Sequence, residues 1–250
     1  MSAALRTEGL TKTWGRFTAN EDLTLSLAVG ARHALIGPNG AGKTTLVNML
    51  AGVLVPTRGD VYLGDARITK LTQHERVQRG LARTFQVNNL FPGLTALESV
   101  TLAVCERTGT AWKTYRRWQD CRAERDEAEA LLASMGLGDV AAIETRHLAY
   151  GQQRLLEIAL ALATKPRVLL LDEPAAGVPK GESETVFRAI AALPADVTVL
   201  FIEHDMDLVF RFAQRITVLV GGRILMEGTP AEVAADPRVR EVYLGEAAHA

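Results

Sequence analysis

Apolar and polar residues alternate near the start of the chain in a way that predicts β-strands. Residues 23–29 read Leu-Thr-Leu-Ser-Leu-Ala-Val, which has the period of two expected of a half-buried strand. Residues 61–63 are Val-Tyr-Leu and follow the turn-forming sequence Pro-Thr-Arg-Gly, so they predict another strand. The region up to about Leu63 is therefore expected to be rich in strands.

The middle of the chain, roughly residues 94–164, has the pattern of helices and carries many charges. Its clearest helix is predicted at residues 124–135. Ala128, Leu131, Leu132 and Met135 share one face of that helix, and charged residues cover the other face. We expect this face to pack against neighbouring helices.

The last third of the chain alternates strand and helix patterns. Residues 168–171 and 197–202 are continuous apolar runs, which favour strands buried on both faces of a parallel sheet, with a crossover helix at 182–192. Nearer the C-terminus, residues 216–220 and 224–226 flank Gly-Gly, a two-residue hairpin signal. The sequence Thr-Pro-Ala-Glu beginning at Thr229 then predicts a helix that opens with a capping box.

Composition and charge exclude several classes of protein. Of the 250 residues, 48% are hydrophobic and 23% are charged, and the formal net charge is −1, so no overall basic field favours nucleic acid. No apolar run approaches the ~20 residues that span a bilayer, and no signal peptide is expected at the N-terminus. Cys105 and Cys121 match no metal or redox spacing, so two separate thiols in a reducing cytoplasm are expected.

Residues 37–45 carry the strongest chemical signal. They fit the phosphate-loop pattern G-x-x-x-x-G-K-[ST], after an apolar strand end at 34–36 and before a predicted helix at 45–50. Glycines let such a loop wrap around a polyphosphate with its N–H groups inward, and the helix N-terminus adds a favourable field for anions. Lys43 is expected to reach the β- and γ-phosphates, and the Thr44 hydroxyl to ligate Mg²⁺. The predicted nucleotide-binding residues are Gly37, Pro38, Asn39, Gly40, Ala41, Gly42, Lys43, Thr44 and Thr45.

Polar side chains follow three of the predicted strands. Asp172 and Glu173 come directly after the strand at 168–171, where Asp172 is expected to hold Mg²⁺ and Glu173 to orient or deprotonate the attacking water. The alternative is that both acids cap the helix that follows. His204 follows the strand at 197–202 and is expected to contact the γ-phosphate or the water. Gln86 closes a short apolar strand at 81–86 and offers an amide oxygen to Mg²⁺.

A second anion site is predicted at residues 148–154, which precede an apolar helix at 155–162. Two phosphate-facing sites on one chain, on opposite sides of a helical insertion, do not easily serve one nucleotide. The simplest arrangement is a dimer in which the second site of each chain covers the first site of the other.

These motifs together resemble the ATPase subunit of ATP-binding-cassette (ABC) transporters, over essentially the whole chain. The matching residues are 37–45 for the Walker A loop, Gln86 for the Q-loop, Ala149, Gly151 and Gln152 within the signature peptide at 148–152, residues 169–173 for the Walker B strand, His204 for the switch histidine, and Trp14 for the aromatic that stacks on adenine. An ordinary core or surface tryptophan is the alternative for Trp14.

The resemblance implies the fold as well as the cofactors ATP and Mg²⁺. The expected fold is α/β: a P-loop NTPase (RecA-like) core with an N-terminal antiparallel β subdomain and an inserted α-helical subdomain. Residues 1–250 would form one nucleotide-binding domain, with the helical subdomain at about 88–164 and a C-terminal hairpin and helices at about 215–246.

Finer details resemble the LivG-type subunits of branched-chain amino acid importers. They include Arg-Thr-Phe-Gln at 83–86, Leu-Ala-Tyr-Gly at 148–151 and the tail Val-Tyr-Leu-Gly-Glu at 242–246. The resemblance implies a second ABC ATPase, identical or related, in a head-to-tail dimer. It also implies two integral membrane permease subunits, an extracytoplasmic solute-binding protein acting indirectly, and a peripheral location on the cytoplasmic face of the plasma membrane. Importers of urea or short-chain amides share much of this pattern, so they remain an alternative.

Two departures from the family pattern affect the expected site. Ala149 stands where the signature serine is usual, and a hydrogen bond to a charged phosphate contributes roughly 1.5–3 kcal/mol. The D-loop sequence Ala-Gly-Val at 176–178 continues directly into Pro179, as if one residue were deleted. A site covered by the signature peptide with Ala149 is expected to be the weaker of the pair, and the shortened D-loop is expected to impair communication across the dimer.

Other classes of ATPase fit less well. The chain lacks the base-reading motif of a GTPase, and it has a second phosphate peptide that a small-molecule kinase does not need. It also lacks the long coiled coil that a DNA-repair ATPase of this superfamily would carry. A regulatory ATPase that works without membrane subunits is disfavoured by residues 87–93. Their Leu-Phe-Pro sequence is expected to be an apolar contact for a membrane subunit, and an ordinary turn is the alternative. The basic, aromatic-rich segment 112–125 is expected to be a solvated helix face, with a membrane surface and then nucleic acid as alternatives.

Overall fold

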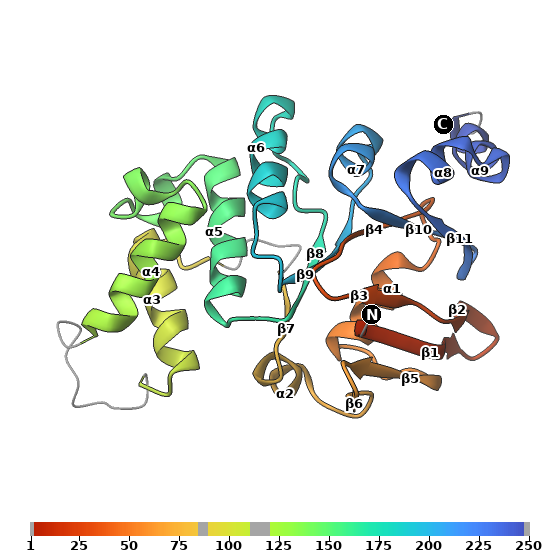
Figure 1. Ribbon diagram of the computed structural model, residues 1–250, viewed down its shortest axis with the longest axis horizontal. Coiled ribbons are helices and arrows are strands. Elements are labelled where there is room, and N and C mark those ends of the chain that lie inside the picture. The colour runs from red at the N-terminus through yellow and green to blue at the C-terminus, as the bar shows by residue number, and fades with distance from the viewer. Residues whose placement is uncertain (1–2, 85–89, 111–120, 248–250) are drawn as a thin grey trace. The chain divides into compact units, whose positions relative to one another are not determined.

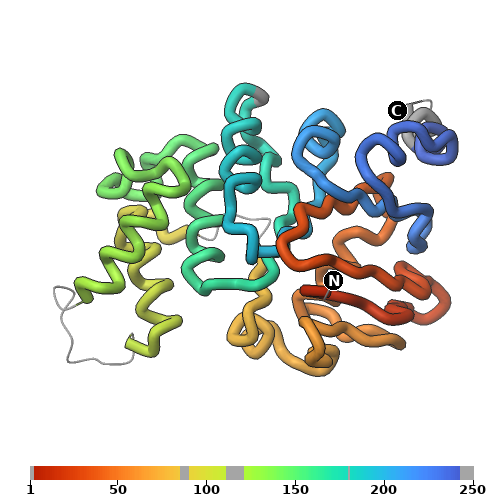
Figure 2. Tube along the Cα trace, viewed as in Figure 1, coloured from red at the N-terminus to blue at the C-terminus, as the bar shows by residue number. Residues whose placement is uncertain are grey.

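The computed structural model describes residues 3–84, 90–110 and 121–247. The chain folds into two compact units. Unit 1 comprises residues 1–83, 167–173 and 194–250, and unit 2 comprises residues 84–166 and 174–193. Figure 2 lets the reader follow the chain by colour as it passes twice from unit 1 into unit 2 and back.

An antiparallel sheet forms the first layer of unit 1 (Figure 1). Its long central strand β1 pairs with three others, in register through Leu10↔Leu23, Leu5↔Leu27 and Leu5↔Leu63. The strands are β1 (Ala3–Trp14), β2 (Phe17–Leu23), β3 (Ser26–Ala28), β5 (Arg58–Leu63) and β6 (Ala66–Arg67). The strand expected at 61–63 is confirmed as part of β5.

The prediction of one continuous strand at 23–29 is wrong. Leu23 ends β2 and Ser26 begins β3, after Asp22 has adopted a left-handed φ of 54°. Leu23, Leu25 and Leu27 are nevertheless buried, whereas Val29 is 54% exposed. Because both short strands lie along the same long strand, the buried alternation continues across the break and conceals it in the sequence.

A six-stranded sheet forms the second layer of unit 1, in the order β11-β10-β4-β9-β8-β7. Pairing is parallel from β10 to β7, and β11 joins the edge as an antiparallel hairpin. The strands are β4 (Arg32–Ile36), β7 (Leu81–Arg83), β8 (Val168–Asp172), β9 (Thr198–Ile202), β10 (Arg215–Val220) and β11 (Arg223–Gly228). Every residue of β4, β8 and β9 is buried, so the two apolar runs at 168–171 and 197–202 are confirmed as central parallel strands.

Helix α1 (Lys43–Ala51) packs between the two sheets of unit 1. Leu46, Met49 and Leu50 of α1 share one apolar core with Leu10 of the antiparallel sheet and Leu200 of the parallel sheet. The end of α1 is held by the fully buried Arg76, whose guanidinium donates to the carbonyls of Met49 and Leu50 at 2.7 and 2.6 Å. The helix that follows the phosphate loop is thus fixed by the core on its sides and by a cation at its C-terminus.

Four further helices complete unit 1: α2 (Gln73–Gln78), α7 (Met206–Phe212), α8 (Pro230–Ala235) and α9 (Pro237–Ala247). The predicted capping box is confirmed, because the hydroxyl of Thr229 accepts from the N–H of Glu232 and the Glu232 carboxylate accepts from the N–H of Thr229. The hairpin around Gly221 and Gly222 is confirmed as well. Within the described residues, no helix is both long enough and apolar enough to span a bilayer.

Unit 2 is helical over its described residues. Its helices are α3 (Ala96–Arg107), α4 (Arg122–Ser134), the 3₁₀ turns η2 (Gly138–Val140) and η3 (Thr145–His147), α5 (Tyr150–Ala163) and α6 (Lys180–Ala191). The helix expected at 124–135 is confirmed as α4, with Ala128, Leu132 and Met135 buried. Cys105 and Cys121 are both free thiols, as expected.

Candidate nucleotide-binding site

The loop between β4 and α1 has a backbone that only glycine accommodates at certain positions. Gly42 lies directly before α1 with a left-handed φ of 98°, and a Cβ there would lie 2.5 Å from the carbonyl oxygen of Ala19. A Cβ on Gly37 would lie 2.1 Å from the carbonyl oxygen of Leu219. The glycines of the motif are therefore required by close backbone neighbours on β2 and β10 as well as by loop curvature.

Lys43 lies inside the curve of this loop. Its side-chain ammonium donates to the carbonyl of Gly37 at 2.6 Å and to that of Pro38 at 3.0 Å, and the residue is only 7% exposed. A cation enclosed by a loop whose N–H groups are at a helix N-terminus gives a strongly favourable environment for an anion. Thr44, the next residue of α1, is exposed and lines the same hollow.

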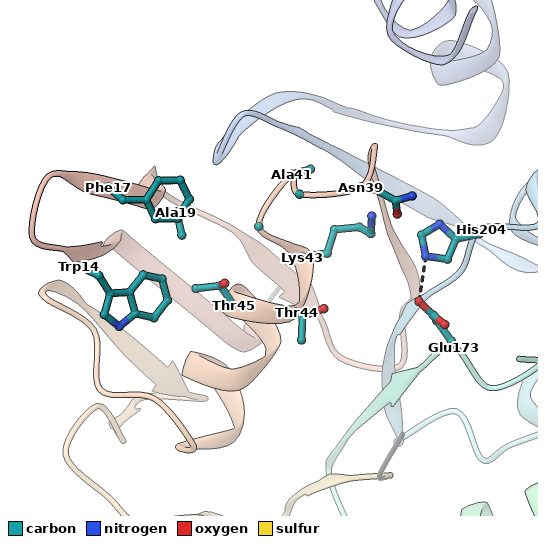
Figure 3. Close-up of a pocket in the computed structure, with 12 residues that line it drawn as sticks. Trp14, Phe17, Ala19, Asn39, Ala41, Lys43, Thr44, Thr45, Glu173 and His204 are labelled. Carbon is teal, nitrogen blue, oxygen red and sulfur yellow. Dashed lines mark hydrogen bonds and ion pairs between the residues drawn. The ribbon is translucent and has the colours of Figure 1, made fainter. Parts of the chain in front are cut away.

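Figure 3 shows a pocket in unit 1 that collects most of the predicted residues. Its volume is about 300 Å³. It is lined by Trp14, Phe17, Ala19, Asn39, Gly40, Ala41, Gly42, Lys43, Thr44, Thr45, Glu173 and His204. The first three come from the hairpin of β1 and β2, the phosphate loop and the start of α1 supply the next seven, and the last two follow β8 and β9. Segments far apart in the sequence thus meet around the phosphate loop.

Glu173 and His204 form a hydrogen-bonded pair at the carboxyl ends of β8 and β9. The Nε2 atom of His204 lies 2.8 Å from Oε1 of Glu173 (Figure 3). Glu173 adopts a left-handed φ of 50°, which is uncommon outside glycine and is typical of residues held in place at functional sites. The pair can orient a carboxylate toward a water molecule in the pocket.

Asp172 is 3% exposed and is paired with Arg83 of β7, with 2.8 Å between Arg83 Nη2 and Asp172 Oδ2. The alternative that Asp172 and Glu173 cap the next helix is wrong. That helix, α6, begins at Lys180 with Pro179 as its N-cap residue. Each acid instead has a side-chain partner across the parallel sheet.

Trp14 and Phe17 form an aromatic platform at one side of the pocket. Their rings are stacked with centroids 6.5 Å apart and an angle of 15° between planes, and they are 46% and 64% exposed. Large exposed aromatic rings beside a phosphate site are suited to stacking a planar base. Phe17 and Ala19 were not predicted from the sequence, although the position of Phe17, three residues after Trp14, was a usable signal.

The remaining predicted residues lie elsewhere. Ala149, Gly151 and Gln152 belong to unit 2, at the start of α5, where the N–H of Ala149 donates to Oε1 of Gln152 at 3.0 Å. A Cβ on Gly151 would lie 2.6 Å from Oε2 of Glu182, so only glycine fits there without a shift of that carboxylate. Gln86 lies outside the described residues, as does most of the basic segment at 112–125.

The donor set fits a hard cation that is shared with phosphate oxygens. Over residues 3–84, 90–110 and 121–247, no group of three or more His, Cys, Asp and Glu side chains could hold a metal by itself. Thr44 offers a hydroxyl, and Oδ1 of Asp172 is buried without a hydrogen-bond partner among the described residues. Mg²⁺ characteristically binds through one or two protein oxygens together with substrate phosphates and water, which matches this pair.

Comparisons with known proteins agree with this geometry. Residues 20–176 match the family described as ABC transporter, and residues 223–249 match the family described as branched-chain amino acid ATP-binding cassette transporter. The chain is 39% identical to the high-affinity branched-chain amino acid transport ATP-binding protein BraF of Pseudomonas aeruginosa, and the alignment covers 97% of this chain and 98% of BraF. It is 38% identical to the corresponding protein LivG of Escherichia coli K12, with the same coverage.

Solved structures of ATP-binding cassettes share this fold, and one of them is a dimer. The crystal structure of the ADP conformation of an ATP-binding cassette has a TM-score of 0.84 and 31% identity, and covers 98% of this chain and 99% of its own. A dimeric post-hydrolysis cassette bound to ADP and Pi has a TM-score of 0.74 and 26% identity, and covers 90% of this chain and 98% of its own.

Proposed function

The chain belongs to the ABC transporter family, and on that premise we propose that it is the ATP-hydrolysing subunit of an importer for branched-chain amino acids. The observation that carries the proposal is the single pocket in which Lys43, Glu173 and His204 meet beside the Trp14 ring. The solute assignment is supported by the names of the relatives and by the match of residues 223–249.

In this proposal the phosphate loop binds the polyphosphate and the aromatic platform binds the base. The Lys43 ammonium leaves the carbonyls of Gly37 and Pro38 to contact the β- and γ-phosphates. Adenine stacks on the Trp14 side of the pocket, where base–aromatic stacking contributes ~1–3 kcal/mol. Both contacts hold the triphosphate in one orientation relative to Glu173.

Asp172 and Thr44 would hold Mg²⁺ together with the phosphates. When bound, the ion neutralises charge that develops on the transferred phosphoryl group. Oδ1 of Asp172 is the available oxygen, because Oδ2 accepts a hydrogen bond from Arg83. Gln86 is a further proposed ligand through its amide oxygen.

Glu173 is the proposed general base. Its carboxylate accepts a proton from the attacking water, and His204 fixes the orientation of that carboxylate through the 2.8 Å contact. The unusual backbone at Glu173 supports this role, since such conformations persist where the surrounding structure holds a reacting side chain in place.

The chain would work in a pair of cassettes bound head to tail. The residues at the start of α5, Ala149, Gly151 and Gln152, would cover the triphosphate of the second cassette, which is identical or related. ATP binding closes the pair and hydrolysis opens it, and two membrane permease subunits follow this cycle. We therefore propose a peripheral location on the cytoplasmic face of the membrane, with an extracytoplasmic solute-binding protein acting indirectly and no role for nucleic acid.

The two sites of such a pair would differ in strength. Ala149 offers no hydroxyl to a phosphate, and an absent hydrogen bond of that kind corresponds to roughly 1.5–3 kcal/mol. The shortened loop at 176–179 would further weaken communication across the pair. We propose that the site built on Lys43 of this chain hydrolyses ATP, and that the site covered by its Ala149 contributes less.

The proposal is tested by Glu173→Gln in the assembled transporter in vesicles. We expect ATP binding to persist, while ATP hydrolysis and ATP-driven leucine uptake fall by at least about 100-fold, the scale of lost general-base catalysis. Glu106→Gln on the exposed surface of α3 is the matched control and should change neither. Unchanged hydrolysis would refute the catalytic assignment. Uptake of urea or acetamide in place of leucine would refute the solute assignment alone.

A further inference from the structure

A buried ion pair joins the ends of β7 and β8 and is not explained by the roles above. Arg83 at the end of β7 and Asp172 at the end of β8 are in contact at 2.8 Å, although 89 residues separate them in the sequence. Their side chains are 13% and 1% exposed. A buried carboxylate is costly unless it is paired, so the fold requires a cation at this position when no metal is bound.

Arg83 also contacts the helix that begins with the phosphate loop. Its Nη1 atom donates to Oδ1 of Asn48 in the middle of α1, at 2.5 Å. One guanidinium therefore joins the helix that carries Lys43 and Thr44 to the strand that carries Asp172. The planar, forked geometry of arginine suits this bridge, which a lysine cannot form with two simultaneous contacts in fixed directions.

The two oxygens of Asp172 have different surroundings. Oδ2 accepts from Arg83, whereas Oδ1 is buried and has no hydrogen-bond partner among the described residues. An arginine that served only to stabilise the fold would be expected to satisfy both oxygens in a bidentate contact. The one-sided contact leaves an oxygen available to a second cation or to a water that the cation carries.

We propose that Arg83 is the resident counter-ion of Asp172, and that Mg²⁺ binds at this carboxylate in competition with it. This inference rests on the proposed function and assigns Arg83 as a positioning residue, because it acts through Asp172 and Asn48. Two cations on one carboxylate repel each other, so metal binding weakens the ion pair and the ion pair weakens metal binding to the same extent.

Arg83 also lies at a point where the chain leaves unit 1. Arg83 is the last residue of the first segment of unit 1, and the chain enters unit 2 at Thr84. A weakening of the contact with Asp172 therefore acts on the residue that joins the two units, three positions before Gln86.

The test measures ADP affinity by titration calorimetry on the purified chain, once in EDTA and once in excess Mg²⁺. The quantity compared is the ratio of the two dissociation constants, Kd in EDTA over Kd in Mg²⁺. In Arg83→Gln the ratio should rise by about fivefold or more, the lower end of typical coupling between sites. The reason is that Mg²⁺ then binds a carboxylate without a competing cation.

Arg76→Gln is the matched control. Arg76 is also a buried arginine, but it donates to backbone carbonyls of Thr69, Met49, Leu50 and Leu71 and contacts no carboxylate among the described residues. Its substitution should lower the melting temperature and leave the ratio of dissociation constants within twofold of the unsubstituted chain, a difference below ~0.4 kcal/mol. If Arg83 served only to stabilise the fold, Arg83→Gln would also leave the ratio of dissociation constants within twofold, as Arg76→Gln does.

Arg83→Lys provides the test if Arg83→Gln does not fold. It keeps a positive charge but cannot hold Asp172 and Asn48 together, so we expect a rise in the ratio of about twofold or more. An unchanged or lower ratio in the variant that folds would overturn the proposal. If the unsubstituted chain bound no ADP in either condition, the nucleotide site itself would be wrong, which is a different and distinguishable result.

Discussion

At the scale of single residues, the pocket is built from side chains held in unusual states. Glu173 has a left-handed backbone, and Lys43 is almost fully enclosed by the loop carbonyls that precede it. A left-handed backbone such as that of Glu173 costs free energy on the order of 1–3 kcal/mol and persists only where neighbours hold it. Both features lie at the same pocket. Their concentration around one hollow is a stronger indication of function than any of them would be alone.

A second residue-scale feature determines how the protein responds to acid. His33 in β4 is 1% exposed, and its Nε2 atom lies 2.7 Å from the hydroxyl of Thr217. Burial, and to a smaller extent the positive charge of Arg215, lower the pKa of His33 to about 4. The nearby carboxylate of Glu227 accepts from the Thr217 hydroxyl at 3.5 Å and from Nε of Arg215 at 3.0 Å.

We predict that His33 destabilises the fold as the pH falls. The unfolded imidazole takes up a proton near pH 6.5, whereas the folded one stays neutral until about pH 4. The free energy of unfolding therefore decreases between these values, by up to ~3 kcal/mol, because the unfolded state binds the proton first. Urea unfolding at pH 7 and pH 4.5 measures the loss.

His33→Gln should reduce that loss, since glutamine keeps a hydrogen-bonding group and does not titrate. The exposed His147→Gln is the control and should leave the pH dependence unchanged. If His33→Gln lost as much stability between the two pH values as the unsubstituted chain, protonation of His33 would not be the cause.

At the scale of elements, the C-terminal hairpin supports the phosphate loop. The N–H of Gly222, in the turn between β10 and β11, donates to the carbonyl of Ala41 at 3.1 Å, and its own carbonyl accepts from the N–H of Glu21 at 2.9 Å. The side chains of Glu21 and Arg223 form an ion pair at 2.7 Å beside it. The hairpin thus joins β2 to the loop that surrounds Lys43.

We predict that Gly222→Ala weakens nucleotide binding. Gly222 has a φ of 78°, and a Cβ there would lie 2.5 Å from the backbone oxygen of Ala19, which cannot move without moving β2. The hairpin must shift and release Ala41, so the dissociation constant for ADP should rise by about tenfold, equivalent to ~1.4 kcal/mol. Titration calorimetry measures the change.

The neighbouring Gly221→Ala is the control. Gly221 has a φ of 52°, also left-handed, but a Cβ there would meet nothing within 4 Å. Both substitutions place alanine in a left-handed backbone conformation, but only Gly222→Ala brings a Cβ into contact with the backbone oxygen of Ala19. Equal ADP affinities in the two variants would show that the hairpin does not support the phosphate loop.

Patterns within one element predicted the fold well, whereas several contacts between distant elements were not predicted. The buried strands β8 and β9 were evident because both faces of a parallel strand are covered, which requires a continuous apolar run. The phosphate loop was evident because its geometry depends on its own glycines. The strand expected at 23–29 failed because its break depends on pairing with β1 rather than on local sequence.

The contacts of the site that were not predicted also depend on which strands are neighbours. Phe17 reaches the pocket because the β1–β2 hairpin faces the loop, and Arg83 reaches Asp172 because β7 and β8 are neighbours in the sheet. The sequence contained both residues, but their partners were set by sheet order. A single sequence does not specify that order beyond the rule that consecutive strands tend to be close.

At the scale of the whole molecule, the predicted residues divide between the two units. The loop, Glu173 and His204 belong to unit 1, while Ala149, Gly151 and Gln152 belong to unit 2. Ala149 gives no side-chain cap to the start of α5, and the first N–H groups of a helix suit an anion. The proposed pairing of two cassettes gives those groups a phosphate to bind.

The most direct test of this pairing measures access to the start of α5. In the assembled transporter carrying Glu173→Gln and Cys121→Ser, a thiol is introduced by Ala149→Cys at an exposed position, and its rate of reaction with a maleimide is measured. Ala133→Cys, exposed on α4 of the same unit, is the control. We predict that ATP with Mg²⁺ slows labelling at position 149 by at least about tenfold, as expected for a group buried in a closed interface, and leaves position 133 unchanged. Equal rates with and without saturating ATP would contradict the account, because the triphosphate would then be enclosed by one subunit.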